Sequence, residues 1–411
     1  MNERVEFVDN AYFVPSGGED PPPSPPPGFT PYAAKYFKGE NGCIISHDQH
    51  LNEDGEALYR FLLAQSHKLP QLFLHVKGEH QEHQTRRVAS TDDDGQTHYK
   101  THSETVTVFD FDFCIDASRY VLPRPTQWTV SDEEPAYRGA MALEVDGGLT
   151  PESARRKATS KECEIADAWN EKKKARGLPP WAGVGGDEGE ILSSTRSMRA
   201  WVDEYCASTK MLKEFTYKKS IYGWNFSALE AAVAAAVRST HYMGELDAHF
   251  TRRADEVHVR ANNWLAHHLS HTWLYSLLWA TLLYPFVWFF QHFSRDGGGR
   301  WEVCGGAYAL VSRRLVDPAD EDAYRSQPPP PPPTGSAGST SSRRTFVRTQ
   351  WDVTEIVGTR EGEWFQEWEG TIKRAVQRGL RSDDPLTKPD DGPLEAAMVL
   401  DGYQARPPVY L

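Results

Sequence analysis

Apolar and polar residues alternate in two stretches of the first third of the chain. Leu72, Leu74 and Val76 occupy every second position, and a second alternating run continues through Cys114. Between the two runs lies TDDDGQ at 91–96, which is rich in turn-forming residues. Because a period of two is typical of β-strands, this pattern predicts a long β-hairpin.

The second strand of this hairpin has the clearest alternation in the chain. Successive side chains of a strand point to opposite faces, so its apolar residues share one face and its carboxylates share the other. The apolar set is Phe109, Phe111, Phe113 and Ile115, and the acidic set is Asp110, Asp112 and Asp116. We predict that the first face is buried and that the second contacts water.

Helical spacing appears on both sides of the hairpin. Leu58, Phe61 and Leu62 indicate a short helix, and residues 150–210 have helical character with breaks at glycine-rich and proline-rich positions. A further helix is predicted to begin at Ser227, since Ser227 and Glu230 have the spacing of a capping box. Strands are predicted around Phe215, Tyr217 and Ile221 and around Val257 and Val259. Residues 40–261 are therefore expected to form an α+β domain.

The most apolar part of the chain is residues 272–290. No Asp, Glu, Lys or Arg occurs between Arg260 and Arg295. Nineteen helical residues span roughly 28 Å, close to the roughly 30 Å of a bilayer's hydrocarbon core. The stretch therefore predicts one transmembrane helix after the α+β domain, with a kink at Pro285. A buried core helix or an interfacial hairpin is the alternative, because His267, His268 and His271 crowd its first end.

Aromatic residues stand at both ends of the predicted transmembrane helix, where their rings would lie at the headgroups. The residues assigned to anchoring are Trp273, Tyr275, Pro285, Trp288 and Phe290. The lipid bilayer is thus the first predicted partner. The balance of Lys and Arg at the two ends does not decide the orientation, and the missing N-terminal signal sequence favours a cytosolic domain.

Proline, glycine and serine mark the segments expected to be disordered. These are the proline-rich tail at 1–35, a linker with six consecutive prolines at 326–342 and a tail at 384–411. A glycine-rich juxtamembrane segment occupies 291–325, and a short strand with an amphipathic helix is predicted at 345–383.

The amphipathic helix in the last quarter of the chain repeats apolar residues every four positions. Its apolar residues are Trp364, Trp368, Ile372, Val376 and Leu380. Acidic residues precede basic ones along it, an order that complements the helix dipole. This face is predicted either to dock on the folded chain, to lie at a membrane surface, or to bind a protein partner.

Composition excludes several classes of function. The formal charge of −13 and the pI near 5.6 oppose a general nucleic-acid surface, although residues 155–176 contain one basic cluster. Five widely spaced cysteines with no C-x-x-C pair favour free thiols. Nucleotide, ester and zinc-protease motifs are all missing, so no catalytic or cofactor-binding residue is assigned.

The hairpin holds the nearest approach to a metal site. His80 and His83 lie on its first strand, and His98 and His102 lie on its second. Residues three apart on a strand point to opposite faces, so His80 and His83 are poorly placed to bind one ion. The aspartates of the second strand offer oxygen ligands for a divalent cation, but solvation of the strand face is the interpretation preferred for them. No metal ligand is therefore assigned.

Several strings in the chain carry a resemblance, among them SHDQHLNEDGEALYRFLL, TVTVFDFDFCID, EYCASTKMLKEFTYKKSIYGWNF and GGGRWEVCGGAYAL. Together they resemble an uncharacterised family of fungal, basidiomycete-type single-pass membrane proteins over roughly residues 28–311. The resemblance implies a soluble region followed by one hydrophobic helix, and it supplies no catalytic residue.

These observations predict a membrane-anchored interaction or adaptor module. The alternatives are an anchored enzyme with an unrecognised active site within residues 40–261, or an accessory subunit of a transport complex. Titratable groups converging in a deep pocket would favour an enzyme, whereas an exposed apolar groove would favour binding.

Overall fold

A computed structural model describes residues 32–91, 97–146, 155–183, 192, 194–270, 284–316, 345–348 and 353–390. The chain forms two compact units, each assembled from three stretches of sequence. Unit 1 comprises Met1–Pro70, Val121–Gly223 and Arg253–Ser312, and unit 2 comprises Gln71–Tyr120, Trp224–Arg252 and Arg313–Leu411. The stretch predicted as one α+β domain, 40–261, therefore contributes to both units.

Unit 1 is built on a six-stranded mixed sheet with the order β1-β2-β11-β9-β12-β5. The strands are β1 (Phe37–Lys38), β2 (Ile44–Ser46), β11 (Glu256–Arg260), β9 (Leu212–Tyr222), β12 (Gly298–Ala309) and β5 (Thr126–Thr129). Two neighbouring pairs are parallel, β2 with β11 and β9 with β12, and the other pairs are antiparallel. The carboxyl ends of β2 and β11 consequently meet at one edge of the sheet.

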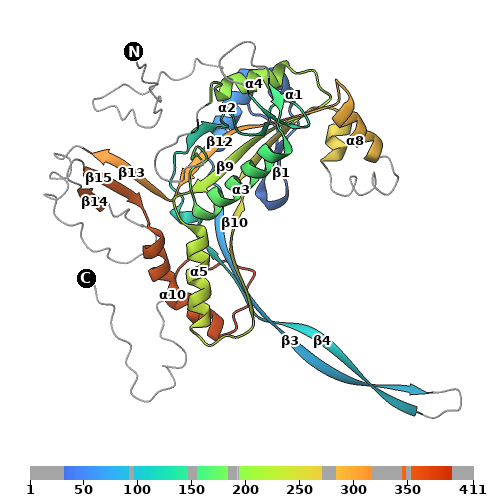
Figure 1. Cartoon of the computed structure of the whole chain (residues 1–411), viewed down its shortest axis with the longest axis vertical. Coiled ribbons are helices and arrows are strands. Elements are labelled where there is room, and N and C mark those ends of the chain that lie inside the picture. The colour runs from blue at the N-terminus through green and yellow to red at the C-terminus, as the bar shows by residue number, and fades with distance from the viewer. Residues whose placement is uncertain are drawn as a thin grey trace. The chain divides into compact units, whose positions relative to one another are not determined.

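Three helices cover one face of this sheet, as Figure 1 shows for α1 (Gln49–Glu53), α2 (Gly55–Ser66) and α4 (Met198–Ala207). Asp54 caps α2 by accepting hydrogen bonds from the first backbone amides, and Ser197 caps α4 in the same way. The helices bury Leu58, Leu62, Trp201 and Val202 against the apolar face of the strands. The predicted helix around Leu58, Phe61 and Leu62 corresponds to α2.

Smaller elements complete unit 1. A three-stranded sheet contains β6 (Ala136–Tyr137), β7 (Leu143–Val145) and β8 (Arg156–Lys157). It precedes α3 (Ser160–Arg176), which begins with a full capping box and ends at Gly177 in the left-handed conformation. A 3-10 turn, η1 (Glu40–Gly42), joins β1 to β2, and two short helices, α6 (Trp264–Leu269) and α8 (Tyr284–Phe293), precede β12.

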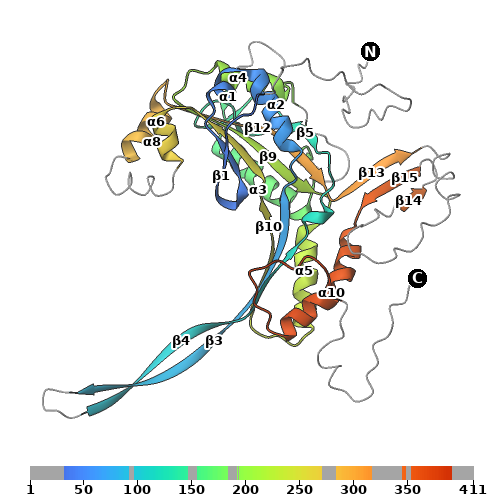
Figure 2. The same cartoon turned by 180° about the vertical axis from the view of Figure 1, so that it is seen from behind.

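Unit 2 contains a three-stranded sheet with the order β10-β3-β4. Its strands are β10 (Glu245–Arg253), β3 (Gln71–Thr91) and β4 (Thr97–Asp116). The antiparallel pairing of β3 with β4 runs from Phe73 opposite Asp116 to Thr91 opposite Thr97, which confirms the predicted hairpin. Figure 2 shows this two-stranded ribbon extending past the helices of the same unit.

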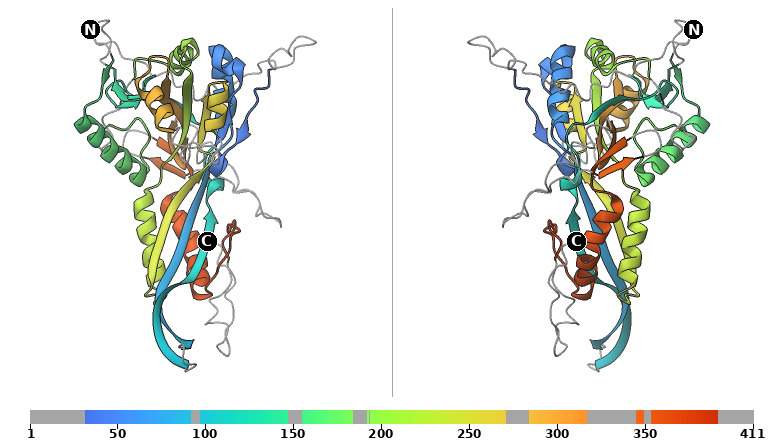
Figure 3. Two further views of the ribbon diagram at one scale, coloured as in Figure 1. Left: turned by 90° about the vertical axis from the view of Figure 1, so that its right-hand side faces the viewer. Right: turned by 90° about the vertical axis from the view of Figure 1, so that its left-hand side faces the viewer.

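Two helices pack against each other in unit 2, α5 (Phe226–Arg238) and α10 (Glu361–Gln377), as Figure 3 shows. Their core is aromatic, with Trp224, Trp364 and Trp368 all buried. The Trp224 indole donates a hydrogen bond to the Thr359 carbonyl, and its ring centroid lies 5.5 Å from that of Trp364. The unit also contains η2 (Ser118–Tyr120) and a sheet of β13 (Val311–Val316), β15 (Val353–Gly358) and β14 (Thr345–Arg348).

The cap of α5 differs from the predicted one. The helix begins at Phe226, and its cap is Asn225, whose side chain accepts a hydrogen bond from the Ala228 amide. Ser227 instead donates to the Asn225 side chain, and Glu230 accepts from the Phe250 amide in β10. The predicted capping box was wrong because Asn225 satisfies the helix two residues earlier and Glu230 is used by a neighbouring strand.

The predicted transmembrane helix over 272–290 is also wrong. No helix in the described part of the chain is long and apolar enough to cross a membrane. Trp273 and Tyr275 fall in 271–283, outside the described residues, and the described end of the stretch is α8, which has ten residues. The membrane and transmembrane assignments, and the integral-membrane localisation, are corrected accordingly. The α+β part of the predicted fold class remains.

A physical reason for this correction lies in how α8 packs. Val287 and Phe290 lie against a small core made by Leu212, Ala261 and Ala266, so one side of the helix is covered by protein. Pro285 lies in the first turn of α8, where an N–H is not needed for a helical hydrogen bond. Phe290 thus packs on protein in place of the predicted anchoring, and Pro285 stands at a helix position where proline is well tolerated.

The segments predicted to be disordered lie mostly outside the described residues, which omit 1–31, 317–344 and 391–411. Two described parts of these segments make contacts. The Lys35 amide donates to the Asp48 carboxylate, and Leu386 exchanges backbone hydrogen bonds with β4 at Cys114 and Asp116.

Candidate functional site

The hairpin residues considered as metal ligands are paired with different neighbours. His80 Nδ1 lies 2.9 Å from the Asp110 carboxylate, whereas His83 Nδ1 lies 2.9 Å from the Thr105 hydroxyl. Asp112 faces His75 at 3.4 Å, and Asp116 accepts a hydrogen bond from the Ser118 amide. His98 and His102 lie in the part of β4 whose side chains are not described. No group of three or more His, Cys, Asp or Glu in the described residues is placed to hold a metal ion.

The predicted faces of β4 are correct for three of the four apolar residues. Phe111, Phe113 and Ile115 are buried, but Phe109 is exposed and lies beneath the Lys77 ammonium group. The register of the ribbon shifts between Gly78 and Glu79, which separates Phe109 from the buried part of the strand. Burial opposes ionisation of Asp110, yet hydrogen bonds from His80 and Tyr242 lower the pKa of this carboxyl.

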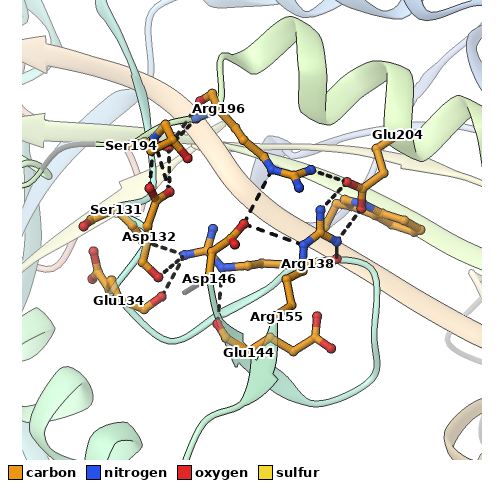
Figure 4. A network of polar contacts seen from close by, with 12 residues as sticks. Ser131, Asp132, Glu134, Arg138, Glu144, Asp146, Arg155, Ser194, Arg196 and Glu204 are labelled. Carbon is orange, nitrogen blue, oxygen red and sulfur yellow. Dashed lines mark hydrogen bonds and ion pairs between the residues drawn. The ribbon is translucent and has the colours of Figure 1, made fainter. Parts of the chain in front are cut away.

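Unit 1 contains a network of arginines and carboxylates (Figure 4), and three of its arginines lie near Trp201. The guanidinium groups of Arg138, Arg155 and Arg196 lie 4.8–5.5 Å from the Trp201 ring centroid. Arg155 forms a two-pronged ion pair with Glu204, and Arg196 Nη1 lies 2.8 Å from the same carboxylate. These contacts fix α4 to the polypeptide that carries β6, β7 and β8.

Arg138 is the most buried member of the network around Trp201, with 1 % of its surface exposed. Its side chain donates to the backbone carbonyls of Ser131, Glu134 and Glu144. Burial lowers the pKa of Arg138, but an arginine stays charged at physiological pH. Since its contacts are to backbone and the pockets described below are lined by other residues, the network is assigned a structural role.

The basic cluster predicted at 155–176 is partly internal. Arg155 belongs to the network around Trp201, and Lys173 is buried, with its ammonium 3.2 Å from Glu134 and 3.2 Å from the Pro180 carbonyl. These two cations are neutralised inside the fold and offer little to a phosphate backbone.

The face of the main sheet opposite the helices carries charged side chains. His258 on β11 lies between Glu214 and Glu256, at 3.0 and 3.1 Å. Arg260 Nη2 lies 3.2 Å from Glu214, and Lys218 lies 2.7 Å from Glu302. Burial opposes the charge on His258, but its two glutamate partners raise its pKa to about 9. Burial likewise opposes the charge on Glu214, and His258 and Arg260 lower its pKa to about 2.

Two pockets lie near His47, which directly follows β2; His47 lines the larger one and contacts Ser270 of the smaller one. One, of about 170 Å³, is lined by Leu212, Lys213, Glu214, Arg260, Ala266, Leu269, Ser270 and Gln291. The other, of about 660 Å³, is lined by His47 itself together with Tyr32, Asp48, Asn262, His267 and neighbouring residues. Both are at the edge where the parallel strands β2 and β11 end, the place where α/β sheets commonly bind ligands.

The aromatic face of α8, defined here as Phe286, Phe289 and Phe293, is an exposed apolar surface of unit 1. These rings are 73, 59 and 66 % exposed, and Phe289 stacks on Phe293 with centroids 4.5 Å apart. An open groove of about 580 Å³ lies along them, lined by Pro285, Phe286, Phe289, Phe290, Phe293 and Ser294. Trp288, predicted as an anchor, is 42 % exposed and stacks on His292.

The apolar residues of α10 are covered by the chain itself. Trp364, Trp368 and Ile372 are fully buried, and Val376 is buried as well. Of the alternatives open for this helix, docking on the folded chain is the arrangement in the structure. The exposed apolar surface is therefore on α8 and not on α10.

Sequence reasoning missed the residues that gather at the strand edge. His47 lies 223 positions from Ser270, and neither these two residues nor Arg260 match a local motif. The available signal was the position of polar residues directly after short buried strands, as in Ile44-Ile45-Ser46-His47. The sequence does not show that β2 pairs with β11, and without this pairing it does not show that His47 lies near Arg260 and Ser270.

Comparison with known proteins adds no assignment. No protein-family model, curated protein or solved structure matches this chain. The resemblance to fungal membrane proteins thus stays an expectation, and function has to be inferred from the site itself.

Proposed function

We propose that this chain is an interaction module that binds a partner protein through the aromatic face of α8. The observation that supports this is the exposure of three phenylalanines at positions i, i+3 and i+7 of one helix. That spacing places the rings in a single row along the helix. Helices with such a row are commonly bound in an apolar groove of a partner protein.

The chemistry of the helix limits the partner. No Asp, Glu, Lys or Arg occurs between Arg260 and Arg295. The segment that carries the aromatic face therefore has no such charge with which to pair a charged group of the partner. Burying a phenylalanine side chain contributes about 1.5–3 kcal/mol, and the three rings already expose more than half of their surface. We therefore expect an uncharged apolar groove in the partner, with the aromatic rings as its main anchors.

Photo-crosslinking tests this proposal. A benzophenone amino acid placed at Phe289 in the full chain would capture the partner in cells, and the partner would then be purified and titrated against the chain. We expect Phe289→Asp to weaken that binding at least 10-fold, because a charge would enter an apolar contact. Met243→Asp is the matched control, since Met243 is a more exposed apolar residue in unit 2.

Several outcomes would contradict the proposal. Equal loss of binding in the two variants would show that the aromatic face is not specific. Crosslinks only to a second copy of the chain, with a dimer in light scattering that Phe289→Asp dissolves, would replace the partner by self-association. Sedimentation with phosphatidylcholine vesicles that depends on Phe289, without any protein crosslink, would also overturn it.

A further inference from the structure

Ser270 lies at the end of α6 with three polar groups around its hydroxyl. His47 Nε2 is 3.0 Å from Ser270 Oγ, Arg260 Nη1 is 2.8 Å away, and the Ala266 carbonyl oxygen is 2.9 Å away. The histidine, the arginine and the serine come from the ends of β2, β11 and α6, respectively. A hydroxyl, an imidazole and a guanidinium therefore meet at one edge of the main sheet.

The proton positions follow from the partners of His47. Its Nδ1 lies 3.0 Å from the Ala261 carbonyl, which can only accept, so Nδ1 carries a proton. Burial lowers the pKa of His47, so the ring is neutral at pH 7 and Nε2 is an acceptor. Arg260 can only donate to Ser270 Oγ. The hydroxyl proton of Ser270 is thus directed either to His47 Nε2 or to the Ala266 carbonyl.

The surroundings hold this arrangement in place. The His267 ring stacks on His47 with centroids 4.0 Å apart, which restricts rotation of the imidazole. Arg260 is held by Glu214 through Nη2, and its buried Nε has no hydrogen-bond partner among the described residues. The guanidinium therefore places a positive charge beside Ser270 Oγ, where it favours an oxyanion.

The pocket beside Ser270 limits what can bind there. Its volume is about 170 Å³, and Leu212, Ala266 and Leu269 supply its apolar lining. Its polar lining comes from Lys213, Glu214, Arg260, Ser270 and Gln291, and Arg260 is paired with Glu214. A space of this size, with apolar side chains beside Ser270, fits the acyl group of a short carboxylic ester.

We propose that Ser270 is a nucleophile and His47 its general base, and that the pair hydrolyses esters of short carboxylic acids. Ser270 Oγ attacks the ester carbonyl carbon while its proton moves to His47 Nε2. The bond from that carbon to the alkoxy oxygen breaks, and His47 returns the proton to the departing alcohol. His47 then takes a proton from water while the water oxygen bonds to the acyl carbon. The bond from that carbon to Ser270 Oγ breaks, His47 returns the proton to Ser270 Oγ, and the carboxylic acid is released. This activity does not depend on partner binding by the aromatic face.

A purely structural role for Ser270 predicts a different behaviour. Its bond to the Ala266 carbonyl is a common way for a serine to satisfy the last turn of a helix. Ser239 does the same at the end of α5, where its hydroxyl donates to the Ala236 carbonyl at 2.6 Å, and no histidine contact is described for it. Ser239 is therefore the matched control for Ser270.

Labelling with a fluorophosphonate probe, followed by peptide mass spectrometry, tests the assignment in the full chain. We expect modification of Ser270 and not of Ser239, together with hydrolysis of p-nitrophenyl acetate. S270A should abolish both signals, H47Q should reduce them about 100-fold or more, and S239A should leave them unchanged. Thermal melting of each variant establishes that the chain is folded.

Two results would overturn the assignment. The first is a folded wild-type chain that neither reacts with the probe nor hydrolyses the ester. The second is labelling of Ser270 that persists unchanged in folded H47Q, which would remove His47 as the base.

Discussion

Helices α8 and α10 both carry rows of aromatic residues, but only one of these rows is covered. In α10, Trp364 and Trp368 are fully buried, and the helix packs along α5 within unit 2. In α8, Val287 and Phe290 face the small core at Leu212, while the rings of the aromatic face contact solvent. The sequence of each helix shows an apolar row. Whether that row is buried depends on residues elsewhere in the chain.

The difference has a thermodynamic consequence. An aromatic ring that is buried in the folded chain stabilises the fold, because its apolar surface leaves water when the chain folds. A ring that stays exposed contributes little to folding, and its apolar surface remains available for binding. Stability should therefore respond to changes in α10, and binding should respond to changes in α8.

The largest expected effect is on the stability of unit 2. Trp364→Ala should lower the free energy of unfolding by about 3–5 kcal/mol, because it leaves a cavity beside Trp224 and Phe250. Phe289→Ala should change it by no more than about 0.5 kcal/mol. Urea denaturation followed by tryptophan fluorescence and circular dichroism measures both changes. Equal changes in the free energy of unfolding for the two substitutions would contradict the proposal that α10 stabilises the fold and α8 does not.

A change of pH should affect the stability of the two units differently; α8 belongs to unit 1 and α10 to unit 2. The folded pKa of His258 in unit 1 is about 9, above its ordinary value of 6.5. Its contribution is therefore fully present below pH 6.5 and is lost as pH rises toward 9. Between pH 6.5 and 8 we expect unit 1 to lose on the order of 1–2 kcal/mol. The range ends at pH 8 because burial lowers the pKa of Lys219, in the same unit, to about 8. Above that pH the titration of Lys219 would also change the stability of unit 1.

H258Q is the variant that isolates this effect. With glutamine at 258, the free energy of unfolding of unit 1 should no longer fall between pH 6.5 and 8, whereas that of unit 2 should be the same in both proteins. Amide hydrogen exchange resolved by peptide reports each unit separately. A pH response that survives in H258Q would assign the titration to another group.

The smallest expected effect concerns an exposed carboxylate on the ribbon. Asp112 is 43 % exposed at its side chain and faces His75 at 3.4 Å, so Asp112→Asn should alter the free energy of unfolding by about 0.5 kcal/mol or less. Phe111→Asp, one residue earlier, is the contrasting variant and should destabilise unit 2 strongly, since a buried ring would become an unpaired charge. A large change in melting temperature for Asp112→Asn, or stabilisation by a divalent cation that it abolishes, would contradict the assignment of Asp112 to the solvent-facing side.

Much of the local structure could be predicted from the sequence because it depends on neighbours in the chain. Alternation predicts β3, β4 and β11, and helical spacing predicts α2 and α10. The position of Phe109 could not be predicted in this way, because a register shift at Gly78 changes its surroundings without changing the alternation. In the same way, Asn225 and Ser227 are both residues preferred at a helix N-cap, and the local sequence does not decide between them.

The candidate sites depend on distant residues, which explains why sequence reasoning missed them. His47 and Ser270 are 223 positions apart and meet only because β2 pairs with β11. The apolar stretch at 272–290 has the length and composition of a membrane helix. Only the packing of Val287 and Phe290 on unit 1 shows that the described part of this stretch is used differently.

Arg138 has a consequence for how unit 1 opens transiently. One side chain holds the carbonyls of Ser131, Glu134 and Glu144, and it also packs on Trp201 of α4. If the guanidinium moves away, all three carbonyls lose their hydrogen bonds at once. The strands β6 and β7 and the turn before them should therefore behave as one foldon, whose opening is coupled to the start of α4 and has no partly open stage.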